Sequence, residues 1–263
     1  MKLTHENYFS KEASTEYMSA SQYKDFAGSL GRKGCEAQAM AKIRGEWQQE
    51  MTTPLLVGSY VDAHFEGSLP MFKAKYPEIF TKGGELKSTF KQADDIITRC
   101  ERDPLFMRYM GGQKQLIFIG EMFGTKWKCK VDSYDPDKSI VDLKVMKSIG
   151  ETKWVRDYGS MLFVEFWGYD IQGAIYQEIV RQNVGKTLPF FIAAASKEKY
   201  TDIEIIGFLQ SNLSDMLSLV QSNIDRVLQV KRGEVEADRC EICDYCKFSK
   251  VLTAPVHYSR LVR

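Results

Sequence analysis

Three short strand candidates follow one another closely in the middle of the chain, and in the third of them Val141, Leu143 and Val145 alternate with Asp142 and Lys144. They are residues 114–121 (KQLIFIGE), 126–134 (KWKCKVDSY) and 140–146 (IVDLKVM). A period of two predicts strands, because successive side chains in a strand point to opposite faces. The sequence DPDKS between the last two segments favours a tight antiparallel hairpin. The chain is therefore expected to build a sheet at its centre.

Helical patterns lie on both sides of this region. Pro54 fits the first turn of a helix over LLVGSYVDAHFEG, and Gly233 fits the end of the last helix. The order of elements predicts one α/β (mixed α+β) domain, with a central mixed sheet flanked by helices. The expected helices cover 18–45 in two pieces broken near Gly31 and Gly34, 54–67, part of 86–101, 161–183 and 211–232, and two further strands are expected near 189–195 and 203–209.

Composition limits the class of protein and its partners. A chain of 263 residues with 44% hydrophobic and 27% charged residues is typical of a globular domain with a substantial core. The 36 Lys and Arg nearly balance the 35 Asp and Glu, so a nucleic-acid site would have to be a local basic channel. The polar opening MKLTHENYFSKEASTEY shows no export signal, and the apolar runs are too short for a membrane span. We expect a cytoplasmic protein without a membrane partner, in which the cysteines form no disulfide framework.

Charged residues on the predicted hairpin allow two interpretations. Symmetrical closure about Asp137 would place Asp132 opposite Asp142, and Lys130 opposite Lys144. Directly opposed like charges destabilise a sheet. Either the register shifts by one residue and the charges form ordinary surface ion pairs, or a divalent cation binds both carboxylates. Mg²⁺ prefers such hard oxygens together with phosphate, so the second interpretation indicates phosphate chemistry assisted by a lysine.

Gln172 and Tyr176 lie four residues apart in GYDIQGAIYQEIV and share one face of the predicted helix. An amphipathic helix with an interfacial tyrosine explains the pair without any site. The alternative is a functional pair, in which the amide contacts phosphate or metal-bound water and the tyrosine contacts a base or phosphate.

Taken together, Val131-Asp132, Asp142-Leu143-Lys144 and Gln172-x-x-x-Tyr176 resemble the PD-(D/E)XK nuclease superfamily and its RecB-like branch. The resemblance is closest to phage and prophage exonucleases of the RecE (exonuclease VIII) type. It spans most of the chain, from YMSASQYKDF through LLVGSYVDAHFEG to the tail CEICDYCKFSK.

The resemblance implies a restriction-endonuclease-like core and a metal-dependent exodeoxyribonuclease. Its implied task is 5′ to 3′ resection of double-stranded DNA ends for a single-strand-annealing protein in phage-type recombination. Asp132 and Asp142 would bind Mg²⁺, which Mn²⁺ can replace, Lys144 would be the catalytic lysine, and Gln172 and Tyr176 would position the scissile strand. The relatives are ring-shaped oligomers, so a homotrimer or homotetramer is expected.

Two alternatives stay open at this point. One is a nuclease module with endonuclease or single-strand activity that serves a helicase or repair complex. The other is a non-catalytic DNA-binding assembly protein that retains the fold. The domain is expected to cover 1–263, with a helical N-terminal part at about 1–50 and a cysteine-containing tail at about 234–263.

The similar nucleases also carry a Gly-x-x-x-His motif whose histidine binds metal. Gly58 plus four residues leads to Asp62, whereas the nearby histidine is His64. Two residues apart on a helix point about 200° apart, so one metal ion would not contact both. Spacing and the preference of Mg²⁺ for carboxylate oxygen favour Asp62, with Glu66 beside it on the same helical face.

Cys240, Cys243 and Cys246 follow a C-x-x-C-x-x-C pattern, and Cys35 lies far upstream. Four thiolates suit a 4Fe–4S cluster or a structural zinc ion, and unliganded thiols are the third alternative. Some RecB-like nucleases carry such a cluster, with one cysteine before the nuclease core and three after it.

Contacts to DNA require basic and aromatic side chains. The segment 147–159 follows the catalytic strand and combines both kinds. Lys147, Trp154 and Arg156 are its main candidates, and Arg32 and Lys33 lie near the entry helix. Ordinary surface positions are the alternative for each of them.

Overall fold

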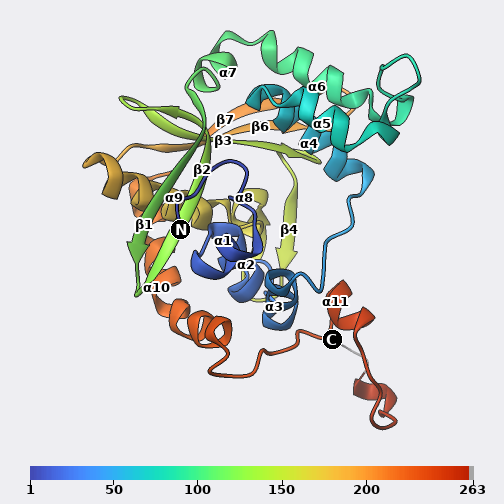
Figure 1. Cartoon of the computed structure of the whole chain (residues 1–263), viewed down its shortest axis with the longest axis vertical. Helices are drawn as coiled ribbons and strands as arrows, with labels where there is room; N and C mark the ends of the chain where they lie inside the picture. The colour runs from blue at the N-terminus through green and yellow to red at the C-terminus, as the bar shows by residue number, and fades with distance from the viewer. Residues whose placement is uncertain (261–263) are drawn as a thin grey trace.

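A mixed sheet forms the centre of the computed structural model, which describes residues 1–260 (Figure 1). The last three residues of the predicted cysteine tail lie outside the described part. The strands stand in the order β1-β2-β3-β6-β7, and each neighbouring pair is antiparallel except β3 and β6, which are parallel. This arrangement confirms the expected mixed sheet flanked by helices. The strand bounds are Gln113–Met122 (β1), Thr125–Asp135 (β2), Ser139–Met146 (β3), Phe190–Ser196 (β6) and Ile203–Gly207 (β7).

The hairpin of β2 and β3 closes as predicted and then opens. Ser133 pairs with Val141, so the register is symmetrical about Asp137. Within the described residues this pairing ends at Ser133, and the two strands separate beyond it. The predicted opposition of Lys130 and Lys144 is therefore wrong: their strands have separated there, and the two lysines pair with residues of β1 and β6 instead.

The helices agree largely with the predicted positions. Glycines in the left-handed conformation, with φ between 74° and 79°, end α3, α4, α9 and α10. Pro54 lies in the first turn of α4, where its missing N–H costs no helical hydrogen bond. The helix bounds are Lys11–Glu16 (α1), Ala20–Ala27 (α2), Glu36–Arg44 (α3), Thr53–Glu66 (α4), Leu69–Lys75 (α5), Gln92–Glu101 (α6), Pro104–Tyr109 (α7), Phe163–Phe166 (α8), Tyr169–Val184 (α9), Gln210–Arg232 (α10) and Asp244–Phe248 (α11), with short 3₁₀ turns at Pro77–Ile79, Ser88–Phe90 and Tyr258–Arg260.

The prediction of one helix over 161–183 is wrong at its start. β5 (Gly159–Leu162) and α8 precede α9, and Gly168 separates the two helices with a φ of 62°. A Cβ at Gly168 would lie 2.9 Å from the Lys24 side chain, which favours glycine in this tight turn. β5 pairs with β4 (Thr152–Val155), so the segment 147–159 is partly a hairpin rather than a loop.

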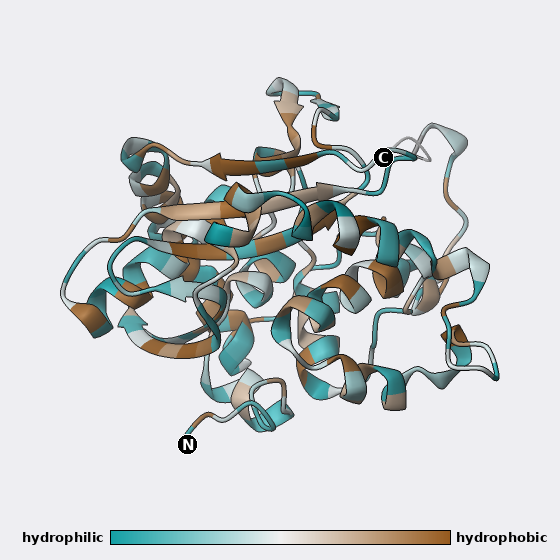
Figure 2. Ribbon diagram, turned by 90° about the horizontal axis from the view of Figure 1, so that it is seen from above, coloured by the Kyte–Doolittle hydropathy of each residue, from teal (hydrophilic) through white to brown (hydrophobic). Residues whose placement is uncertain are grey.

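The two faces of the sheet enter two separate hydrophobic cores. On β3, Ile140 packs into the core covered by α2, α9 and α10, whereas Val141 and Leu143 pack into the core covered by α4, α6 and α7. Figure 1 shows α4–α7 gathered on one side of the sheet, and Figure 2 shows hydrophobic stretches along the strands between the helices. Within residues 1–260, no helix combines the length and the apolar character that a membrane crossing requires.

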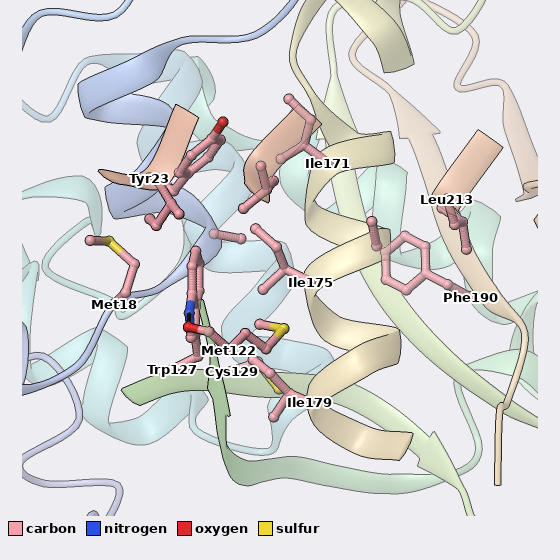
Figure 3. Close-up of a cluster of buried hydrophobic side chains, with 14 of the residues drawn as sticks. Met18, Tyr23, Met122, Trp127, Cys129, Ile171, Ile175, Ile179, Phe190 and Leu213 are labelled. Atoms are coloured by element: carbon pink, nitrogen blue, oxygen red, sulfur yellow. Dashed lines mark hydrogen bonds between the residues drawn. The ribbon is translucent and has the colours of Figure 1, made fainter. Parts of the chain in front are cut away.

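The core under α9 is built around Trp127, which is fully buried and whose Nε1 donates to the Met122 carbonyl at 3.1 Å. Ile171, Ile175 and Ile179 recur every four residues and project from one side of α9 towards this tryptophan (Figure 3). This packing fixes the rotation of α9 about its axis. The polar residues of the same helix are thereby placed beside β3.

We predict opposite effects on stability for two glycines inside helices. A Cβ at Gly173 of α9 would lie 2.5 Å from Cδ1 of the buried Phe190, whereas a Cβ at Gly58 of α4 would meet its nearest atoms at 3.9 Å. Overpacking costs about 1–3 kcal/mol, and replacing a helical glycine with alanine gains at most about 1 kcal/mol. In urea unfolding, Gly173→Ala should lower the free energy of unfolding and Gly58→Ala should raise it. Equal stabilisation by both changes would contradict the close packing of α9 on β6.

Candidate active site

Asp142 lies on β3, on the side that faces α9, and its side chain is only 5% exposed. Its Oδ1 accepts a hydrogen bond from Gln172 Nε2 at 2.7 Å. Its Oδ2 forms an ion pair with Lys144 Nζ and, among the described residues, accepts no hydrogen bond. The strand and the helix together hold one carboxylate oxygen and leave the other available to a cation.

Asp132 occupies the gap where β2 separates from β3. Its Oδ2 accepts a hydrogen bond from the backbone N–H of Leu143 at 2.8 Å, which replaces the strand pairing that has ended there. Its Oδ1 accepts a hydrogen bond from Gln115 Nε2 of β1 at 3.0 Å. The carboxylate is therefore fixed from both neighbouring strands.

The pKa values in the cluster of Asp62, Asp132, Asp142 and Lys144 reflect several acidic side chains that lie close together and are shielded from water. Burial raises the pKa of Asp132 to about 7, and the nearby Asp142 contributes to the rise. Burial also raises the pKa of Asp62 well above its usual range, with Asp132 as the next cause. For Lys144, burial is the largest single effect and favours a lower pKa, but the charges of Asp142, Tyr169 and Asp132 together outweigh it and the pKa lies above its ordinary value. Lys144 therefore keeps its positive charge at neutral pH.

These residues fit a divalent cation. Gln115 Oε1 is buried and accepts no hydrogen bond within the described part of the chain, which is costly unless another group binds it, and Asp142 Oδ2 is held there only by its ion pair with Lys144. Asp62, Asp132 and Gln115 also line one small cavity together with Glu66. Carboxylate and amide oxygens are the ligands that Mg²⁺ and Mn²⁺ prefer. Asp62, Asp132 and Asp142 are the residues that would hold the ion.

The structure separates Asp62 from His64. Asp62 lies close enough to Asp132, Lys144 and Asp142 for their charges to act on its carboxyl group. His64 instead contacts Glu101 of α6, with 2.8 Å between Nε2 and Oε1. The geometry supports Asp62 as the third acid of the site, and its role as a ligand stays a prediction. Glu66 lines the same cavity, as its helical spacing suggests.

Gln172 and Tyr176 lie on the same helix, α9, but differ in their burial and contacts. Gln172 is buried and orients Asp142, whereas Tyr176 is partly buried one helical turn later. The Tyr176 ring packs against Phe190, with 6.1 Å between ring centroids. Burial, followed by the charge of Asp142, raises the pKa of Tyr176 well above its usual range. Its hydroxyl therefore stays protonated at neutral pH and able to donate a hydrogen bond.

Sequence reasoning missed Gln115. The segment KQLIFIGE predicts an ordinary strand, and nothing in it gives a reason to single out one polar residue. In the structure, Gln115 adopts a φ of 55°, a region that residues other than glycine rarely occupy. This unusual backbone accompanies a buried amide whose Nε2 reaches Asp132. No local signal in the sequence indicates such a conformation.

A basic and aromatic pocket beside the cluster was anticipated only at Arg32 and Lys33. Lys24, Arg32, Trp167 and Tyr169 line this pocket. The nitrogens of Lys24 and Lys144 lie 5.2 Å and 5.3 Å from the Tyr169 ring centroid, and the Arg32 guanidinium lies 4.3 Å from that of Trp167. Burial, followed by the charge of Lys144, lowers the pKa of Lys24 to about 8. The shared Tyr169 ring connects the pocket to the acid cluster.

The other predicted DNA-contacting residues lie on the β4–β5 hairpin, which extends from the sheet towards α3 (Figure 1). Trp154 is 74% exposed on β4, and Arg156 is exposed in the turn that follows. Lys147 precedes the hairpin and forms an ion pair with Glu151 at 3.2 Å. None of these three residues lines the basic and aromatic pocket.

The four cysteines of the predicted metal site also lie close together in the structure. Cys35, Cys240, Cys243 and Cys246 place their Sγ atoms within 4.8 Å of one another. Cys100 and Cys129 lie elsewhere, fully buried in the two hydrophobic cores.

A mixed sheet whose hairpin separates at an Asp/Asp/Lys cluster, with a Gln/Tyr helix beside it, defines a PD-(D/E)XK nuclease-like protein. The chain belongs to the family described as a PDDEXK-like domain of unknown function (DUF3799), whose model matches residues 19–249. It is also similar to a protein from Eubacterium rectale with a known crystal structure, described as a "Putative exonuclease". The two share 58% sequence identity and a TM-score of 0.96, over 100% of this chain and 98% of the other. No curated protein gives a significant match.

We predict that the stabilising effect of a divalent cation increases with pH. The raised pKa of Asp132 means that the metal-free folded protein binds more protons than the unfolded chain between the usual aspartate pKa and about 7. Its stability therefore decreases as pH rises through this range. A cation binds the deprotonated carboxylates, so Mn²⁺ should raise the Tm more at a pH of about 8 than at about 5. The same increase in Tm at both pH values would contradict this titration.

Asp62 and His64 provide a matched pair two residues apart. We expect Asp62→Asn to reduce the Mn²⁺-dependent increase in Tm strongly, because it removes one of the three charged oxygen ligands. His64→Gln should keep that increase, since His64 contacts Glu101 instead. Thermal denaturation with and without Mn²⁺ measures both variants, and the reverse pattern would assign the metal to His64.

Proposed function

We propose that this protein is a metal-dependent exodeoxyribonuclease that resects double-stranded DNA ends, 5′ to 3′, for single-strand-annealing recombination. The observation that carries the proposal is the pair of carboxylates at the separating strands, fixed by Leu143 N–H and Gln172, with Lys144 beside them. The similarity to the Eubacterium rectale protein supports exonuclease activity over other nuclease activities. The polarity, a homotrimer or homotetramer and an annealing partner rest on the resemblance to RecE-type enzymes alone.

In this proposal, each residue of the site has a different role in phosphodiester hydrolysis. A divalent cation bound there would neutralise charge on the phosphate and lower the pKa of a water molecule. Gln172 holds Asp142 so that Oδ2 faces the site, and Leu143 N–H with Gln115 holds Asp132. Lys144 places a permanent positive charge where negative charge develops on the phosphate.

The pocket of Lys24, Arg32, Trp167 and Tyr169 suits a DNA strand that leads to the cluster. The cationic side chains neutralise backbone phosphates, and the aromatic rings accept unstacked bases. In this proposal, Trp154 and Arg156 on the exposed β4–β5 hairpin contact the duplex that follows. A basic channel of this kind is compatible with the near-zero net charge of the chain.

We predict that Asp142→Asn and Lys144→Ala each reduce DNA cleavage by at least about 100-fold. The first change removes a charged metal ligand, and the second removes the charge that faces the phosphate. Circular dichroism and Tm should show that both variants remain folded. Lys138→Ala serves as the control, because Lys138 is exposed in the turn between β2 and β3 and pairs with Asp135 outside the cluster. Wild-type activity in either of the first two variants would refute the mechanism.

The same cleavage assay distinguishes the alternative functions when it is repeated with different DNA substrates. Linear duplex labelled at the 5′ or the 3′ end, with and without Mg²⁺, should show stepwise loss from the 5′ end only when the metal is present. Cleavage of covalently closed circles would instead indicate an endonuclease module. Binding without cleavage of any DNA would indicate the non-catalytic assembly protein.

A further inference from the structure

Four cysteines from distant parts of the sequence meet at the start of α3. Cys35 is the N-cap residue of this helix, and it lies 211 positions before Cys246. Cys35 and Cys246 are buried, and Cys240 and Cys243 are partly buried. Each residue offers one sulfur, and the four sulfurs lie within 4.8 Å of one another.

The distances between the sulfurs distinguish the candidate groups. Four thiolates about 2.3 Å from one zinc ion form a tetrahedron whose corners are about 3.8 Å apart. The Cys35–Cys246 and Cys240–Cys246 sulfur distances are 3.5 Å and 4.0 Å. In a four-iron cluster each thiolate binds a different iron, which places the sulfurs roughly 6 Å apart. The arrangement is too compact for the cluster and fits a single ion. We propose that Cys35, Cys240, Cys243 and Cys246 bind one structural Zn²⁺.

The surrounding backbone suits thiolates. The N–H groups of Gln38, Cys243 and Cys246 point at the sulfurs of Cys35, Cys240 and Cys243, at 3.5 Å, 3.3 Å and 3.4 Å. Such N–H donors stabilise the negative charge of metal-bound sulfur and orient the ligands. Disulfides do not explain the cluster, since a sulfur–sulfur bond is only about 2.05 Å long.

The C-terminal tail, residues 234–259, has few other contacts that would attach it to the rest of the protein. Within residues 234–259, Cys246 is the one buried residue, and only the partly buried Val235 and Ala237 pack against a hydrophobic core. Its other attachments are partly exposed: Trp47 packs against Tyr245 and Phe248 at 5.7 Å and 5.4 Å between ring centroids, and the Asp238 N–H donates to Glu36 Oε2 at 2.8 Å. Metal ligation supplies folding free energy where apolar burial does not.

Metal analysis of the purified full-length protein tests the proposal directly. Protein produced with both iron and zinc available and purified without oxygen should contain one zinc ion per chain and show no visible absorption. Cys246→Ser should lose that zinc, whereas Cys100→Ser should keep it, because Cys100 lies buried in the other core. Four irons per chain with a broad visible absorption would overturn the proposal, as would wild-type protein without metal.

Two further measurements separate this site from the acid cluster and do not depend on a folded cysteine variant. X-ray absorption at the zinc edge of the wild-type protein should show four sulfur ligands at about 2.3 Å. Oxygen or nitrogen ligands would refute the four-cysteine site. Asp142→Asn should retain the full zinc content, so loss of cleavage in that variant leaves the zinc result independent. Loss of zinc in Asp142→Asn would place the ion at the acid cluster and contradict the proposal.

Discussion

The hydrogen bond from Leu143 N–H to Asp132 is the interaction on which the site depends. A regular hairpin would pair β2 and β3 along their whole length and place two aspartates directly opposite each other. Instead, pairing ends at Ser133, and the Asp132 carboxylate supplies the acceptor that the strand no longer provides. One side chain therefore both satisfies the open edge of β3 and brings a negative charge to Asp142. The opening in the sheet and the acid cluster have the same physical origin.

Several features compensate for concentrating acids in this opening. Lys144 pairs with Asp142, Gln115 and Gln172 donate to the two carboxylates, and raised pKa values show that some acids prefer the neutral form without a cation. These contacts fix the orientation of the carboxylates before any ion binds. Gln115 Oε1 still accepts no hydrogen bond within residues 1–260, so the compensation is incomplete in protein alone. The protein contacts thus orient the carboxylates without a cation, and a bound cation would complete the compensation of their negative charge.

Local sequence patterns predict the helices and central strands of this protein well, and they predict its specific side-chain contacts poorly. Short apolar runs located the central strands, with period-two alternation in β3, and proline or glycine marked the ends of α4 and α10, because backbone geometry depends on nearby residues. The strands β4 and β5 were missed, since a short exposed hairpin buries too little apolar surface to show alternation. Gln115 and the Lys24 pocket were missed for another reason: their positions depend on contacts between segments that are distant in sequence. The acid cluster was anticipated through resemblance to known nucleases, whereas the hairpin charges alone left two interpretations open.

The two candidate metal sites differ in the chemistry of their ligands and are separated by the basic pocket. Cys35 and Cys243 line that pocket on one side, and Lys24 and Tyr169 connect it to the acid cluster on the other. Hard oxygen ligands favour Mg²⁺ or Mn²⁺, whereas four thiolates favour zinc, so each site selects its ion by ligand type. A tail fixed at Cys35 also fixes the start of α3 and one wall of the pocket. In this proposal, the sulfur site supports the proposed DNA path through the backbone at Cys35 and Cys243.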